Sequence, residues 1–371
     1  MVIVHMPIRV LIVEDSPTQR LALAHMIESS PDLIVCGLAV DGEQAVEMTE
    51  RLRPDVISMD VQMPRVNGLD ATRRIMSSTP TPIVVVSAVN TSPLALDALQ
   101  SGALAVVEKP PAPNDPDYAA RCSEIVQLLK LMAEVHVIRH WPQERDRRPV
   151  TKPLSGLTTP PPTNYWLTPV PPTIVGIGAS AGGPGALATL LASLPADFPL
   201  PILVVQHLAP DFVPGLAEWL DRVCSLTVRL ATAGELPTRG NVYIAPGNRH
   251  LRISADRRLV LDSIVGNYRH CPAVDAMFES LATVYGTQAL GIILTGMGDD
   301  GAAGLRAMRD SGGHTIAQDE QSCVVFGMPA AAIARGAAES VLPLSEIAMA
   351  MQQSVGYSSH SHNHRNSANS A

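Results

Sequence analysis

Short apolar runs alternate with amphipathic stretches along residues 6–130. Between the first two runs, Leu23, Met26 and Ile27 recur at helical spacing behind a Ser-Pro pair, which is a favourable helix start. Repeated alternation of strand and helix predicts an α/β domain whose parallel sheet is covered by helices on both faces. The predicted strands are IRVLIV (8–13), LIVCGLAV (33–40), DVISM (55–59), IVVVSA (83–88) and ALAVV (103–107).

The same alternation returns in residues 173–352 and predicts a second α/β domain, so that the chain holds two doubly wound parallel sheets. Within the second domain, LRIS and RLVLD fit the two strands of a hairpin joined through Ala255 and Asp256. The other predicted strands are TIVGIG, PILVVQH, SLTVRL, NVYIAP, ALGIILT, HTIAQ and CVVFG.

Two further segments lack this alternation. Residues 131–172 separate the domains, and the nine prolines and missing periodicity of 139–172 predict a semi-rigid, extended linker. Residues 353–371 are polar and low in complexity, so a disordered tail rich in His, Ser and Asn is expected there.

Charge and composition exclude several classes of protein. The formal net charge is -8 and the Lys and Arg residues are dispersed, which argues against nucleic-acid binding. No apolar run reaches the roughly 18–20 residues of a membrane span, so no membrane insertion is expected. The opening MVIVHMPIRV lacks the features of a secretory signal, and we therefore expect a cytoplasmic protein. Five scattered cysteines without a C-x-x-C pair predict buried free thiols rather than zinc or disulfides.

Chemically active side chains follow the predicted strands of the first domain. Glu14 and Asp15 end the first strand, Asp60 the third and Ser87 the fourth, and Lys109 follows the fifth. The carboxyl ends of parallel strands share one edge of the sheet, so these groups converge there. Clustered carboxylates call for a hard cation such as Mg²⁺, and an aspartate beside Mg²⁺ and a lysine can accept a phosphoryl group.

Together with Met63-Pro64, Gly68 and Pro110, these residues resemble the receiver domain of two-component response regulators, which has a flavodoxin-like fold. By that resemblance the domain accepts a phosphoryl group from a sensor histidine kinase of the chemotaxis type. The roles it implies are phosphoacceptor for Asp60, Mg²⁺ ligands for Glu14, Asp15 and Asp60, switch hydroxyl for Ser87 and phosphate partner for Lys109.

Two positions depart from the receiver pattern. Gln62 stands where related proteins often carry an acidic residue, and Val106 stands where receivers usually place an aromatic side chain. With Val106 at the second position, this chain lacks the side chain on which the aromatic part of the usual receiver switch relies.

The stretch TIVGIGASAGG (173–183) fits two templates. One is a tight turn that presents Ser180 as a nucleophile, and the other is a dinucleotide-binding glycine loop. The dinucleotide template needs an acidic residue at the end of the next strand, but PILVVQHLAP offers Gln206 and His207. A nucleophile instead needs a base and a group that orients the base, which favours Ser180 as the nucleophile.

Three strand ends of the second domain supply a serine, a histidine and an aspartate. After ALGIILT, Asp299 and Asp300 lie among glycines that allow backbone N–H groups to turn inward as an oxyanion cradle. Taken singly, Ser180 also fits a helix N-cap, His207 a structural histidine and Asp300 a turn residue. Their combination at one sheet edge favours a catalytic triad.

The motifs IGASAGG, VVQHLAP, IAPGNRHL, ILTGMGDDGAAGL and CVVFGMP together resemble the Rossmann-like catalytic domain of the chemotaxis receptor methylesterases. That resemblance implies that Ser180 is the nucleophile, His207 the general base and Asp300 the orienting acid. The backbone N–H groups of Ala181 and Met297 are the implied oxyanion donors. Ala181 replaces a threonine common in the family, which leaves the backbone donor intact.

The resemblance also implies the substrate, which is the γ-methyl ester of glutamate on the cytoplasmic domain of a methylated chemoreceptor. Ester hydrolysis needs no cofactor, some family members also deamidate receptor glutamine, and we expect a monomer. NYRHCPAVDAMF (267–278) resembles a segment at the active-site rim, where Arg269 and His270 fit contacts to an acidic receptor surface or a solvated loop. A receiver ahead of an esterase suggests that the unphosphorylated receiver covers the catalytic cleft. A transcription factor is disfavoured because residues 173–350 lack a basic helix-turn-helix.

Overall fold

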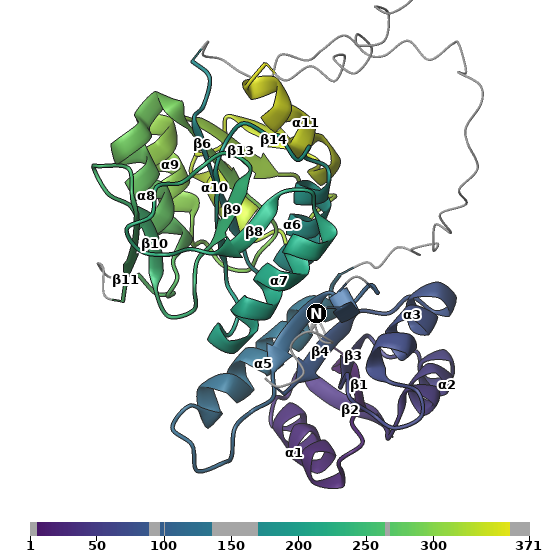
Figure 1. Ribbon diagram of the computed structural model, residues 1–371. Helices are drawn as coiled ribbons and strands as arrows, with labels where there is room; N and C mark the ends of the chain where they lie inside the picture. The colour runs from purple at the N-terminus through teal and green to yellow at the C-terminus, as the bar shows by residue number, and fades with distance from the viewer. Residues whose placement is uncertain (1–5, 89–96, 100, 136–169, 264–267, 357–371) are drawn as a thin grey trace, which may run out of the picture.

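The computed structural model describes residues 6–88, 97–99, 101–135, 170–263 and 268–356. Each predicted domain forms its own layered α/β unit within these ranges (Figure 1). Most of the predicted linker, 131–172, and nearly all of the predicted tail, 353–371, lie outside the described residues.

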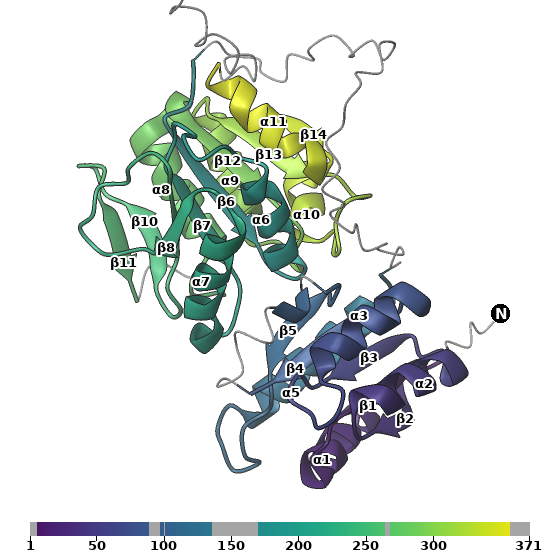
Figure 2. The ribbon, with the colours of Figure 1, turned by 45° about the vertical axis from the view of Figure 1, so that its right-hand side comes forward.

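The first unit is a five-stranded parallel sheet in the order β2-β1-β3-β4-β5, the flavodoxin-like order that the receiver resemblance implies. Helices α1 and α5 pack on one face, and α2 and α3 pack on the other (Figure 2). The strands are β1 Ile8–Val13, β2 Leu33–Ala39, β3 Val56–Met59, β4 Ile83–Ser87 and β5 Ala105–Glu108. The helices are α1 Pro17–Glu28, α2 Gly42–Leu52, α3 Gly68–Ser78 and α5 Tyr118–Ala133.

Side chains of β1 alternate between the two faces as expected for a strand covered on both sides. Val10 and Ile12 join the apolar cluster beneath α1 and α5, and Leu11 and Val13 join the cluster beneath α2 and α3. Helices α1, α2 and α3 begin at polar caps; at α2, Asp41 accepts the backbone N–H of Gln44 at 2.9 Å. This two-sided burial confirms the predicted fold class for the first domain.

The second unit is a seven-stranded parallel sheet in the order β14-β13-β12-β6-β7-β9-β8. Helices α6, α7 and α11 cover one face, and α8, α9 and α10 cover the other (Figure 2). The strands are β6 Ile174–Ala179, β7 Ile202–Gln206, β8 Thr227–Leu230, β9 Asn241–Ile244, β12 Ala289–Ile293, β13 His314–Gln318 and β14 Ser340–Leu342. The helices are α6 Gly183–Ala192, α7 Val213–Val223, α8 Val274–Tyr285, α9 Ala302–Asp310, α10 Met328–Ala334 and α11 Leu344–Ser354, with 3₁₀ turns at Pro210–Phe212 and Gly286–Gln288.

Two details of the second sheet test the sequence predictions. The hairpin is confirmed, because β10 (His250–Ile253) and β11 (Leu259–Asp262) pair antiparallel. The prediction that CVVFG forms a strand is wrong, since Phe326 makes a single bridge to Gly296 and the edge strand is β14 instead. The backbone of Val325 is hydrogen-bonded to the loop after β12 instead of to a strand. Its N–H donates to the Thr295 hydroxyl, and its carbonyl accepts from the Gly296 N–H.

Glycines in β6 let helix α8 lie very close to the centre of the sheet. A Cβ on Gly176 would come within 2.5 Å of a methyl group of Leu281, and a Cβ on Gly178 would overlap the side chain of Val274. The glycines of GIG therefore serve helix packing, which is a role that neither sequence template assigned to them.

All five cysteines are free, as predicted, but the prediction that they are buried is wrong. Cys271 is exposed in the loop before α8, and the other four are half-buried. Among the described helices, none combines the length and the apolar character that crossing a membrane requires.

Phe278 on α8 provides a test of this packing, because its side chain is fully buried and its ring lies against Gly176 of β6. We expect Phe278→Ala to destabilise the second domain by about 3–5 kcal/mol, since it removes apolar contacts and leaves a cavity. Urea unfolding followed by tryptophan fluorescence measures this, because Trp219 is buried in the same domain. The half-exposed Leu236 is the control, and Leu236→Ala should change stability by no more than about 0.5 kcal/mol. Equal effects of the two substitutions would contradict the packing described here.

Candidate active site and phosphoacceptor site

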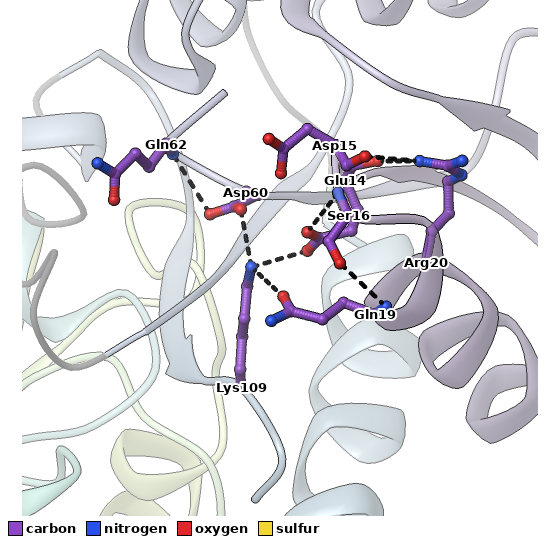
Figure 3. A network of polar contacts seen from close by, with 8 residues as sticks. All are labelled: Glu14, Asp15, Ser16, Gln19, Arg20, Asp60, Gln62 and Lys109. Atoms are coloured by element: carbon purple, nitrogen blue, oxygen red, sulfur yellow. Dashed lines mark hydrogen bonds and ion pairs between the residues drawn. The ribbon is translucent and has the colours of Figure 1, made fainter. Parts of the chain in front are cut away.

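The acidic pocket of the first domain is built around the ammonium group of Lys109 (Figure 3). Its Nζ lies 2.7 Å from Asp60 Oδ2, 2.8 Å from Glu14 Oε2 and 2.7 Å from Gln19 Oε1. The contacts with Asp60 and Gln19 are hydrogen bonds, and the contact with Glu14 is an ion pair. The predicted convergence of Glu14, Asp60 and Lys109 is thus present, and Gln19 is a contact that the sequence reasoning missed.

Burial and ion pairing shift the pKa values of Glu14 and Lys109 in this pocket. Burial raises the pKa of Glu14, and the contact with Lys109 offsets only part of that rise. Burial lowers the pKa of Lys109, but its contacts with the carboxylates of Asp60 and Glu14 outweigh this, so its pKa is raised overall. Ser87 is buried at the end of β4, and its carbonyl accepts the backbone N–H of Lys109 at 3.0 Å.

The residues present fit a Mg²⁺ ion. Glu14, Asp15 and Asp60 each offer a carboxylate oxygen, and these oxygens lie within 4.8 Å of one another. Oxygen donors at this spacing match the preference of a hard divalent cation. Gly68 keeps the neighbouring loop tight, because a Cβ there would overlap the carbonyl oxygen of Asp60.

In the second domain, Ser180, His207 and Asp300 come from three adjacent strands. β6 pairs with β7 on one side and with β12 on the other, so the turns after these strands share one edge. His207 Nε2 lies 2.8 Å from Asp300 Oδ2. The prediction that Asp300 rather than Asp299 faces the histidine agrees with the geometry, since Asp299 pairs with Arg335 instead.

The carboxylate of Asp300 is held by the start of helix α8. The backbone N–H of Val274 donates to Oδ2 at 2.8 Å, and that of Asp275 donates to Oδ1 at 3.0 Å. Burial raises the pKa of Asp300, but His207 and these two backbone donors lower it by more, so its pKa lies below the ordinary value. Asp300 is therefore a carboxylate at neutral pH, which suits a group that orients a histidine.

His270 stacks on the ring of His207, with the ring centroids 4.5 Å apart and the planes inclined by 23°. Desolvation lowers the pKa of His270, and the neighbouring His207 lowers it further. A second positive charge beside His207 is thus disfavoured. Arg269 is exposed beside this pair, so both predicted rim residues lie near the site.

The turn that carries Ser180 is fixed by Thr295 at the end of β12. The backbone N–H of Ser180 donates to the Thr295 carbonyl at 3.0 Å, and the Thr295 hydroxyl donates to the Ala181 carbonyl at 2.9 Å. Within the described chain, no acceptor takes the backbone N–H of Ala181 or Met297. These two N–H groups are the predicted oxyanion donors, and that role stays a prediction. No sequence pattern points to Thr295, because its contacts arise only where three loops meet.

Comparison with known proteins agrees with this geometry. Residues 175–351 match the model of the CheB methylesterase, and residues 10–117 match that of the response regulator receiver domain. A protein-glutamate methylesterase/protein-glutamine glutaminase of Myxococcus xanthus (strain DK1622) is 45% identical over 344 residues, or 92% of this chain and 95% of the relative. The chain belongs to the CheB methylesterase family.

A second relative with the same descriptive name, from Nitrosospira multiformis (strain ATCC 25196), is 42% identical and covers 94% of this chain and 97% of its own length. Both relatives align with more than nine-tenths of this chain, so the alignments take in the receiver domain as well as the methylesterase domain. This confirms the resemblance on which the sequence predictions rested.

Asp275 allows a test of the electrostatics at the start of α8. Burial raises the pKa of Asp275 to about 6, although the Gly304 backbone N–H donates to its Oδ1 at 2.6 Å. An aspartate whose pKa lies above its ordinary value of 3.8 stabilises the fold fully below that value, and the contribution is lost as pH rises through about 6.

We therefore expect Asp275→Asn to raise the melting temperature at pH 7.5 by roughly 2–4 °C, and to leave it unchanged near pH 4. Thermal unfolding at the two pH values measures this. Asp310→Asn is the opposite-sign control, because Arg306 lowers the pKa of Asp310. An Asp275→Asn variant that is less stable at pH 7.5 would show that the carboxylate is needed there.

Proposed function

We propose that this chain hydrolyses γ-methyl esters of glutamate on the cytoplasmic domain of chemoreceptors, with Ser180 as the nucleophile. The observation that carries the proposal is the 2.8 Å contact between His207 and Asp300 on the strand ends that flank Ser180. The printed names of the relatives pair methylesterase with glutaminase activity. Hydrolysis of a glutamine side chain needs the same attack on a carbonyl, so we propose deamidation as a second reaction of this site.

The chemistry follows from the residues. Asp300 engages Nε2 of His207, which leaves Nδ1 to take the proton of Ser180 as its oxygen attacks the ester carbonyl. The backbone N–H groups of Ala181 and Met297 stabilise the oxyanion, and methanol leaves with a proton from His207. Water then attacks the glutamyl-serine ester with His207 again as the base, which releases the glutamate carboxylate. None of these steps draws on a metal or cofactor.

Regulation follows from contacts between the domains. Val325 lies in one buried cluster with receiver residues such as Val107, and Ala181 and Val324 pack against that cluster. An ion pair of 3.6 Å joins Arg222 at the end of α7 to Asp97 of the receiver. Because Ala181 directly follows Ser180, these contacts support a receiver that restricts access to the nucleophile until Asp60 is phosphorylated.

The receiver site takes the phosphoryl group from a sensor histidine kinase of the chemotaxis type. Glu14, Asp15 and Asp60 would hold Mg²⁺, which neutralises charge on a transferring phosphoryl group when bound. Lys109 positions the phosphoryl oxygens, and Ser87 is the switch hydroxyl. Arg269 and His270, at the rim of the catalytic site, contact the receptor. The protein acts as a monomer, and it acts in the cytoplasm together with the kinase and the receptor's cytoplasmic domain.

Ser180→Ala should lower the rate of methanol release from methylated receptor membranes by roughly 10³-fold or more, because no other group can form the acyl intermediate. The matched control is Ser193→Ala, which removes an exposed hydroxyl at the end of α6. The control should keep wild-type activity. A Ser180→Ala variant with undiminished methanol release would refute the triad.

Asp60→Asn should abolish the response to a small phosphodonor such as acetyl phosphate with Mg²⁺, because an amide cannot accept the phosphoryl group. Methanol release with and without the phosphodonor measures the response, and intact mass reports the added phosphoryl group. Asp70→Asn, an exposed residue that pairs with Arg73, is the control and should respond normally. The regulatory proposal is wrong if Asp60→Asn and wild type respond alike.

A further inference from the structure

We infer that Gln206 is a positioning residue whose side-chain amide sets the nucleophile relative to the base; the inference rests on the proposed roles of Ser180 and His207. Its Nε2 donates to the carbonyl of Ser180 at 2.8 Å and to the carbonyl of His207 at 2.9 Å. One amide group therefore links the backbones of both residues. The sequence analysis uses Gln206 only as evidence against a dinucleotide site, because that site needs an acidic residue at this strand end.

The orientation of the amide follows from its two partners. Both are carbonyl oxygens, so only the NH₂ group can face them, and a flipped amide would set three oxygens against one another. Gln206 is 2% exposed, and Oε1 has no hydrogen-bond partner among the described residues. A buried polar atom left without a partner is costly, which indicates that the two bonds to Nε2 are what retain an amide here.

The place of these bonds in the sheet explains why they matter. β6 and β7 pair up to Ala179 and Gln206, and the His207 N–H donates to the Ala179 carbonyl at 3.0 Å as the last backbone bond. Beyond this point the two chains turn away as the loops that carry the reactive side chains. The Gln206 amide adds one more cross-strand link, made by a side chain instead of the backbone.

Ser180 is consequently held at both of its peptide groups. Its N–H donates to the Thr295 carbonyl, and its carbonyl accepts from Gly183 N–H at 2.8 Å as well as from Gln206. A Cβ on Gly183 would overlap Oε1 of Gln206 and would come within 2.9 Å of the Ala179 Cβ. A misplacement of about 1 Å between reacting groups can cost about 10²-fold in rate, so this restraint bears directly on kcat.

The test uses full-length protein activated by a phosphodonor, with methylated receptor membranes as substrate. Gln206→Met keeps the length and volume of the side chain but removes both donors, and Gln206→Glu keeps the shape but faces two carbonyls with a carboxylate. We expect kcat to fall roughly 10- to 100-fold in both variants, with KM changed less than about twofold. Rates are normalised to folded protein from circular dichroism, since a purely structural role would lower the folded fraction and leave its kcat intact.

Gln352→Met is the matched control, because Gln352 also donates to a backbone carbonyl between two elements, that of Ser193 at 3.3 Å. It should keep wild-type kcat. If Gln206→Met does the same while Ser180→Ala is inactive, the inference about Gln206 is wrong and the proposed function stands. If Ser180→Ala remains active, the proposed function itself has failed.

A double-mutant cycle with Gly183 probes the same contact from the other side. Gly183→Ala should lower kcat because its Cβ displaces the amide, and Gln206→Ala should lower it because the amide is gone. Because a Cβ on Gly183 also comes within 2.9 Å of the Ala179 Cβ, the double variant should be somewhat slower than Gln206→Ala, but its loss should be smaller than the product of the two single losses. Losses that multiply would show that Gly183 and Gln206 act independently and would overturn the inference.

Discussion

The negative charge of the buried Asp300 carboxylate needs hydrogen-bond donors, and the start of helix α8 supplies them. Helix α8 begins at Val274 and gives its first two backbone N–H groups to this carboxylate. The helix can reach that position because Gly176 and Gly178 leave room beside β6. With its charge satisfied in this way, Asp300 can hold His207 without being protonated itself.

Both domains use the same physical rule. Parallel strands end at a common edge, and side chains placed after the strands meet there without any local sequence motif that joins them. In the receiver, Glu14, Asp60 and Lys109 meet at such an edge. In the esterase domain, Ser180, His207 and Asp300 follow adjacent strands at another such edge. Ala181, the residue after Ser180, packs against the apolar cluster of the receiver, so the receiver borders the turn that carries Ser180.

The strands and the strand-end residues could be predicted from the sequence, because strand periodicity and the convergence of strand ends are local or topological rules. Thr295, Gln206 and Gln19 could not, since each acts through hydrogen bonds to segments distant in sequence. The prediction of a strand at CVVFG is wrong for a related reason. Its apolar character is that of a strand, but the backbone of Val325 is bonded to the loop that supports Ser180.

The proposed mechanism requires an activated Ser180 whose exposure is set by the receiver. Labelling with a fluorophosphonate probe, with peptide mass spectrometry to locate the adduct, tests both parts at once. We expect an adduct on Ser180 that forms faster after treatment with acetyl phosphate and Mg²⁺, and that is lost in His207→Ala. An adduct on another residue, or a rate at Ser180 that ignores both the phosphodonor and His207, would contradict it.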